Sequence, residues 1–216
     1  MSSSAAVPRS DAASGATREH LRALAEQRFR GSVDLAERFF DAHADAISRA
    51  CLAMAERFRG GGRLLAFGDG AAATDAQHVS VEFVHPVLVG KRALPALALG
   101  SDAATLSGAA ASASVGDAFA RVLGVLGREA DIAMGIAGPA SGNSVAPGLA
   151  RAGRMRMLTL ALAGGDGAGL ERVGTDFLFV VPSNDPMLVQ EVHETLYHVL
   201  WELVHVFFER GESRDS

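Results

Sequence analysis

Short apolar runs alternate with helical patterns along most of the chain, and this alternation constrains the fold more than any other feature. Five runs are strand candidates: residues 63–67, 94–99, 131–136, 156–162 and 176–181. Each run is mainly apolar, without a strict alternation of polar and apolar residues, which is typical of strands that are covered on both faces. Strands separated by helices form parallel sheets. The sequence therefore predicts an α/β fold, a parallel five-stranded sheet with helices on both faces.

Helical patterns precede the sheet. We expect one helix over residues 18–29, with Thr17 as a possible N-cap, and a longer helix over residues 32–58. In the longer helix, apolar residues recur at steps of three and four. Gly60-Gly61-Gly62 is expected to end it.

The remaining helices and the domain limits follow from the same patterns. Helices are expected over residues 74–83, 117–127, from the loop 137–144 to 153, and 187–209. We expect residues 1–16 to form a disordered tail, residues 17–60 to form N-terminal helices, and residues 61–210 to form the sheet domain. No linker divides the helices from the sheet, so they are predicted to form one structural domain.

Composition excludes several classes of protein. Hydrophobic residues make up 49% and charged residues 21%, which is a globular composition. The net charge is −5 and no block of Lys or Arg stands out, so we expect no nucleic-acid partner. No apolar run reaches the roughly 20 residues that span a bilayer, and residues 1–16 lack the apolar segment of a secretory signal. The single cysteine, Cys51, fits a reducing compartment, so we expect a cytoplasmic protein without a membrane partner.

Two distant helical stretches each carry possible metal ligands on one face, because residues four apart on a helix point the same way. They are His78 and Glu82 in the first stretch, and Gln190, Glu194 and His198 in the second. Imidazole, carboxylate and amide oxygen suit a divalent ion such as zinc. The first stretch follows a Gly-rich turn after a strand, where α/β sheets bind ligands. We therefore predict one metal site between the two helices, and spacing alone leaves open whether Gln190 or Glu194 completes it.

Ordinary structural roles would explain some of these patterns. A polar pair four residues apart on a helix is usually a surface contact, and the second stretch also reads as the polar edge of an amphipathic helix. We interpret His193 and His205 as structural or exposed residues rather than ligands.

Three motifs together resemble the sugar isomerase (SIS) domain, and more narrowly the bacterial phosphoheptose isomerases. They are Asp75-Ala76-Gln77-His78 with Glu82, Gln190-Glu191-Val192-His193 with His198, and Ser141-Gly142-Asn143-Ser144. The turn of residues 68–72 is similar to the family's Gly-Asn-Gly-Gly-Ser turn. The resemblance covers residues 19–209 in the order of the predicted elements.

The resemblance implies a flavodoxin- or Rossmann-like three-layer sheet, N-terminal helices that build a homotetramer, and active sites between subunits. The implied activity converts sedoheptulose 7-phosphate to a heptose 7-phosphate through an enediol(ate). It implies one divalent metal per subunit, zinc first, on His78, Glu82, Gln190 and His198, with Glu82 as general base and His198 as acid. The implied residues for the sugar phosphate are Gly70, Ala71, Ala72, Asp102, Ser141, Asn143 and Ser144.

The chain departs from the family's pattern around the phosphate. Asp69 stands where the family has Asn, Ala72 stands where it has Ser, and Pro139 lacks a backbone N–H. The charge of Asp69 would oppose a phosphate dianion. Two alternatives therefore stay open. One is a metal-containing SIS protein for a different, non-phosphorylated sugar-like ligand. The other is a SIS-fold binding or scaffold protein that resembles the family's replication-initiator-associating member.

Overall fold

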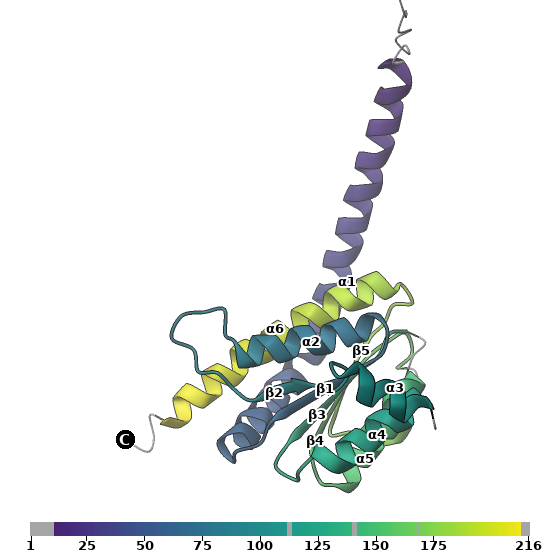
Figure 1. Cartoon of the computed structure of the whole chain (residues 1–216). Helices are drawn as coiled ribbons and strands as arrows, with labels where there is room; N and C mark the ends of the chain where they lie inside the picture. The colour runs from purple at the N-terminus through teal and green to yellow at the C-terminus, as the bar shows by residue number, and fades with distance from the viewer. Residues whose placement is uncertain (1–10, 112–113, 140–141, 168, 213–216) are drawn as a thin grey trace, which may run out of the picture.

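A parallel sheet of five strands forms the centre of the computed structural model, which describes residues 11–111, 114–139, 142–167 and 169–212 (Figure 1). The strands lie in the order β2-β1-β3-β4-β5, and every pair is parallel. Their bounds are β1 (Leu64–Phe67), β2 (Ala96–Ala98), β3 (Ile132–Ile136), β4 (Leu158–Gly164) and β5 (Phe177–Val181). The α/β fold with a parallel five-stranded sheet is therefore confirmed.

The strand order reverses beside β1. The chain leaves β1 toward β2 at the edge and then crosses to β3 on the other side of β1. In sheets of this kind, ligands bind outside the carboxyl ends of the strands where the order reverses. The turn after β1 and the loop after β3 meet at that position, so this edge is where a site is expected.

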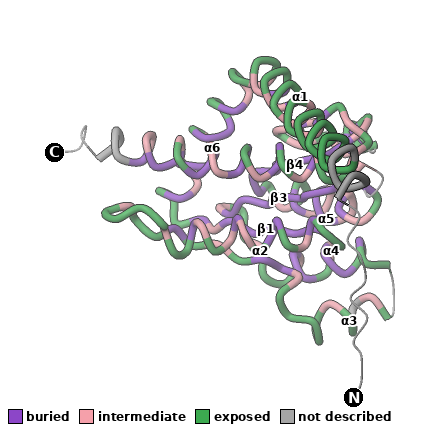
Figure 2. Tube along the Cα trace, turned by 90° about the horizontal axis from the view of Figure 1, so that it is seen from above, coloured by how far each residue is buried: buried purple, intermediate pink, exposed green. Residues whose placement is uncertain are grey.

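Helices cover both faces of the sheet, as predicted (Figure 1). One face carries α1 (Asp11–Arg59), α2 (Ala71–Val84) and α6 (Pro186–Glu212); the other carries α3 (Ala103–Ala111), α4 (Val115–Leu126), α5 (Gly142–Arg154) and the 3₁₀ helix η1 (Leu170–Val173). A hydrophobic core lies on each face of the sheet, and alternate residues of a strand face one core or the other. Leu64 and Ala66 face the first, and Leu65 and Phe67 face the second. Figure 2 shows the strands buried and much of α1 exposed.

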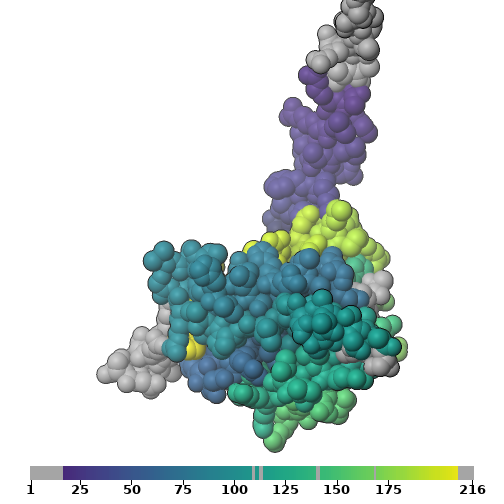
Figure 3. Space-filling view, viewed as in Figure 1, coloured from purple at the N-terminus to yellow at the C-terminus, as the bar shows by residue number. Residues whose placement is uncertain are grey.

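The two predicted N-terminal helices are one continuous helix, so the predicted break near residue 30 is wrong. Glycine inside a helix costs about 1 kcal/mol relative to alanine, which is too little to end a helix that is held on both sides. Arg28 binds Asp185 at 2.5 Å before Gly31, and Ser32 binds Glu191 after it. The first half of α1 projects from the body of the molecule (Figures 1 and 3).

Other element bounds also differ from the sequence-based expectation. The predicted tail covers residues 1–16, of which 1–10 lie outside the described residues, whereas Asp11 already begins α1. The sequence pattern missed α3 and η1. The edge strand β2 is shorter than predicted, since Pro95 has no N–H to donate to a neighbouring strand. Among the described helices, none has the length and apolar character needed to span a membrane.

A buried carboxylate ties the amino ends of β1 and β3 together. Asp131 is 1% exposed and accepts hydrogen bonds from the backbone N–H groups of Arg63 (2.8 Å) and Arg128 (3.0 Å). The Arg63 guanidinium also binds it, at 2.7 Å. Buried polar groups need such partners, because an unmade hydrogen bond costs the full desolvation of the group.

We expect Asp131→Ala to lower the free energy of unfolding by about 3 kcal/mol, because it leaves two backbone donors and a guanidinium without their acceptor. Urea denaturation measures the change. Glu129→Ala is the matched control, since its ion pair with Arg156 is exposed and should contribute less than about 1 kcal/mol. Equal effects of the two substitutions would contradict this account.

Candidate functional site

Helices α2 and α6 lie side by side on the same face of the sheet, and hydrogen bonds join them at successive turns. The turn after β1 leads directly into α2, and α6 follows β5, so both helices start at the carboxyl edge of the sheet. Among the side-chain hydrogen bonds that cross between them, three are 2.9 Å long: Gln190 Nε2 to Asp75 Oδ1, Tyr197 Oη with His78 Nδ1, and Trp201 Nε1 to the Glu82 carbonyl. These bonds fix the register of the two helices and so the positions of their polar side chains.

His78, Glu82 and His198 converge between the two helices and are called the imidazole–carboxylate cluster below. Glu82 Oε1 lies 3.3 Å from His78 Nε2 and 3.6 Å from His198 Nε2. The Glu82 side chain is 14% exposed, whereas both imidazoles are about two-fifths exposed. The cluster is therefore open to solvent on the histidine side and closed behind the carboxylate.

Two spacings within this cluster fit a small divalent cation. Ligand atoms at about 2.0–2.1 Å in a tetrahedron are about 3.3–3.4 Å from one another. The two distances to Glu82 Oε1 are close to that value, and two imidazoles with a carboxylate are a donor set that zinc accepts. Glu82 thus lies at ligand spacing from both histidines.

Gln190 and Glu194 occupy different positions around this cluster. The Gln190 amide nitrogen donates to Asp75, and its amide oxygen is the atom that remains for a metal. Glu194 Oε1 lies 3.6 Å from His78 Nδ1, and Glu194 offers an atom within 4.8 Å of atoms of both histidines. Glu194 therefore lies close enough to the cluster to affect its charge and geometry, whereas Gln190 is joined to α2 through Asp75.

Two buried polar side chains, Asp75 and Tyr197, lie beside the imidazole–carboxylate cluster. Asp75 is 5% exposed, and burial raises its pKa; the hydrogen bond from Gln190 opposes that rise, and the charge of Glu194 adds to it. Burial also raises the pKa of Tyr197, with the charges of Asp75, Glu194 and Glu82 contributing. The phenol therefore stays protonated. The low-dielectric environment around these groups strengthens their hydrogen bonds.

The two other histidines of α6 are structural. His193 is buried, its Nε2 lies 3.3 Å from the Ala163 carbonyl, and burial lowers its pKa to about 4. His205 is buried with both ring nitrogens on backbone carbonyls, those of Trp201 and Arg92. Both imidazoles thus bond backbone carbonyls rather than the cluster, in keeping with their interpretation from the sequence.

A recess of about 340 Å³ lies at the carboxyl edge of the sheet, beside the start of α2. It is lined by Asp69, Gly70, Ala71, Ala72, Gly138, Pro139 and Pro186. Gly70 has φ +56°, a conformation that side chains with a Cβ rarely adopt. The predicted phosphate turn therefore does line a recess, although no hydroxyl of the turn itself reaches it.

The remaining predicted sugar-phosphate residues are scattered. The Ser144 hydroxyl donates to Asp69 Oδ1 at 2.8 Å, so the two sides of the recess are joined through a carboxylate. Asn143 is exposed on the first turn of α5, and Ser141 lies outside the described residues. Asp102 accepts hydrogen bonds from the Thr105 hydroxyl and from the N–H groups of Thr105 and Ala104 at the start of α3, and these bonds lower its pKa. In this structure Asp102 is thus a helix cap.

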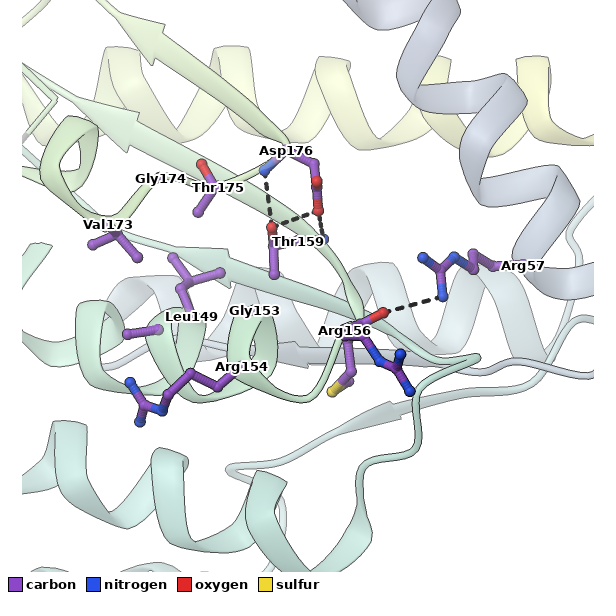
Figure 4. A pocket seen from close by; sticks show the side chains of 12 residues that line it. Arg57, Leu149, Gly153, Arg154, Arg156, Thr159, Val173, Gly174, Thr175 and Asp176 are labelled. Carbon is purple, nitrogen blue, oxygen red and sulfur yellow. Dashed lines mark hydrogen bonds between the residues drawn. The ribbon is translucent and has the colours of Figure 1, made fainter.

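A larger pocket of about 580 Å³ lies at the opposite edge of the sheet, at the amino ends of β4 and β5 (Figure 4). Thr159 and Asp176 form its polar floor and bind each other at 2.7 Å. Arg57 reaches the carbonyl of Arg156 beside them. Since these polar groups satisfy one another and lie far along the strands from the predicted motifs, this pocket is not part of the candidate site.

Sequence reasoning missed the supporting residues Asp75, Tyr197 and Trp201. In the sequence, Asp75 enters only as part of a motif, and the two aromatic residues carry no predicted role. The one available signal was their spacing: Tyr197 and Trp201 are four residues apart on α6 and so lie on one face. Which residues of α2 they meet depends on the packing of the two helices.

Comparison with known proteins identifies relatives along most of the chain. A model of the SIS domain matches residues 29–163. A phosphoheptose isomerase of Thermodesulfovibrio yellowstonii is 35% identical over 179 residues, which are 82% of this chain and 89% of that protein. A phosphoheptose isomerase of Aquifex aeolicus is 32% identical over 176 residues, covering 82% of this chain and 92% of that protein.

Solved structures agree with these sequence matches. The phosphoheptose isomerase of Neisseria gonorrhoeae superposes with a TM-score of 0.77 at 25% identity, over 85% of this chain and 98% of that chain. The enzyme of Francisella tularensis gives the same TM-score at 27% identity, over 83% of this chain and 95% of that chain. The likeness therefore extends through almost the whole of these relatives.

Proposed function

The chain belongs to the SIS domain family, and from that premise we propose that it is a metal-dependent aldose–ketose isomerase of the phosphoheptose type. The proposed reaction interconverts sedoheptulose 7-phosphate and a heptose 7-phosphate. The observation that carries the proposal is the imidazole–carboxylate cluster, which lies on two helices that start at the edge where such sheets bind ligands.

The proposed metal site uses His78, Glu82, Gln190 and His198, with zinc as the first candidate. Gln190 would contribute its amide oxygen, because its amide nitrogen is held by Asp75. A divalent cation bound there would polarise the sugar carbonyl as a Lewis acid.

The isomerisation needs one group that removes a proton from the carbon beside the carbonyl and a second group that donates a proton to the enediol(ate). Glu82 is the proposed base, using the oxygen that does not face the two imidazoles. His198 is the proposed acid, which protonates the enediol(ate) from the other side. Glu82 Oε1 and His198 Nε2, the atoms assigned to the metal, lie 3.6 Å apart, so the base and the acid would both act beside the bound cation. The exposed histidine side of the cluster is the route by which the sugar would enter.

We expect His78→Ala to remove the bound metal and to lower kcat/KM for sedoheptulose 7-phosphate by at least about 100-fold, because the cluster loses one of its ligands. Metal content and a coupled turnover assay measure the two effects. His85→Ala is the control, since His85 is exposed just after α2 and should leave both unchanged. Metal-loaded wild-type protein that leaves this substrate unchanged would reject the proposed reaction and favour a binding or scaffold role.

One contact favours a second candidate, a different sugar-like substrate without a phosphate at this position. The Ser144 hydroxyl, which would otherwise donate to a phosphate, donates to the Asp69 carboxylate. A carboxylate beside the recess repels a phosphate dianion and accepts hydrogen bonds from neutral hydroxyl groups. The same scaffold could therefore take a neutral polyol end in place of a phosphate.

We expect Asp69→Asn to strengthen binding of sugar phosphates about tenfold, because the substitution removes one negative charge from beside the recess. Calorimetric titration with a sugar phosphate measures the change, and the matching unphosphorylated sugar is the control. Wild-type protein that binds the neutral sugar more tightly than the phosphate would support the second candidate.

We also propose a homotetramer built through the projecting half of α1. Its exposed apolar residues support this: Leu21, Leu24, Phe29 and Val33 are 58%, 48%, 71% and 38% exposed. A lone helix with so many exposed apolar residues is a typical contact surface for another chain.

The double substitution Leu24→Glu with Phe29→Glu is expected to reduce the oligomer to smaller species, because it places charges in the proposed contact. Light scattering after size-exclusion chromatography gives the mass. Arg30→Glu, also exposed on this half of the helix, is the control for a general charge effect. A monomeric wild-type protein would contradict the proposal.

A further inference from the structure

Tyr197 packs against both histidines of the cluster, whose rings also contact each other at 5.4 Å between centroids. It is 1% exposed, so its ring is fixed by packing. Its ring meets His78 edge-on at 5.3 Å between centroids and His198 at 5.1 Å, with interplanar angles of 72° and 83°. One buried aromatic residue therefore sets the orientation of both imidazoles.

The Tyr197 hydroxyl also engages the ring nitrogen of His78 that points away from Glu82. Tyr197 Oη lies 2.9 Å from Nδ1, while Nε2 lies 3.3 Å from Glu82 Oε1. A histidine that gives Nε2 to a metal must keep its proton on Nδ1, and a partner on Nδ1 fixes that tautomer and the ring orientation.

Glu194 is the competing partner for the same nitrogen. Its Oε1 is 3.6 Å from Nδ1, beyond hydrogen-bond distance, and its side chain is 47% exposed. The Tyr197 hydroxyl is closer and buried. A hydroxyl can both donate and accept, so it pairs with Nδ1 whether or not that nitrogen carries the proton. A carboxylate can pair only with the protonated nitrogen.

We infer that Tyr197 is a positioning residue whose hydroxyl holds His78 in the ring orientation that directs Nε2 toward Glu82. The inference rests on the proposed metal site. It assigns Tyr197 no contact with the sugar, and its effect on the chemistry passes through His78.

The test compares Tyr197→Phe, which keeps the ring and removes the hydroxyl, with the wild-type protein. We expect zinc affinity, measured by competition with a chromophoric chelator, to fall 10- to 100-fold, as for other outer partners of metal-bound histidines. Thr195→Val is the matched control. It also removes a hydroxyl from α6, but one that bonds only the helix's own Glu191 carbonyl, and zinc affinity should not change.

A second measurement separates positioning from folding. The thermal midpoint of metal-free Tyr197→Phe should stay close to that of the metal-free wild type, because the ring and its packing are kept. Zinc affinity of Tyr197→Phe within threefold of wild type would overturn the inference. So would a larger loss in Glu194→Gln than in Tyr197→Phe, because Glu194 would then be the partner that matters.

The outcome for the wild type separates this inference from the proposed activity. Wild-type protein that binds no zinc at micromolar concentration overturns the role of Tyr197. Turnover of sedoheptulose 7-phosphate by that metal-free protein would still support an isomerase, whereas zinc binding without turnover would reject the isomerase and leave the role of Tyr197 standing.

Discussion

The pairing of α2 with α6 is the interaction on which the candidate site depends. Three hydrogen bonds of 2.9 Å, from Gln190, Tyr197 and Trp201, cross between the helices at successive turns and set their register. A shift of one residue along either helix would turn its polar side chains by about 100° and separate the histidines. The supporting residues and the predicted ligands thus form one structural unit.

The proposed catalytic groups lie on helix surfaces, and the proposed substrate recess is lined by loops. Glu82 and His198 are held by packed helices, and rigid elements position reactive groups more precisely than loops do. The turn after β1 and the loop after β3 line the recess, and loops vary more readily than the elements they connect. A chain can therefore keep a family's reactive groups while its substrate contacts change.

The recess shows such a change in one contact. The Asp69 carboxylate accepts a hydrogen bond from the Ser144 hydroxyl. Two groups that could each contact a ligand thus contact one another instead. The charge at this position decides between a phosphate and a neutral group more directly than the shape of the recess does, because charge interactions in a partly buried site are strong. The reactive cluster would serve either substrate.

Periodicity in the sequence determined the five parallel strands, their helical covers and the placing of His78 with Glu82 on one helix face, because these features depend on residues close together in the chain. Tertiary structure alone decided the rest. Contacts with α6 keep α1 helical through Gly31, where local helix propensity predicts a break. The partnership of Tyr197 with His78 joins residues 119 positions apart, and no local pattern encodes which faces of two distant helices will meet. That choice follows from how the whole core packs.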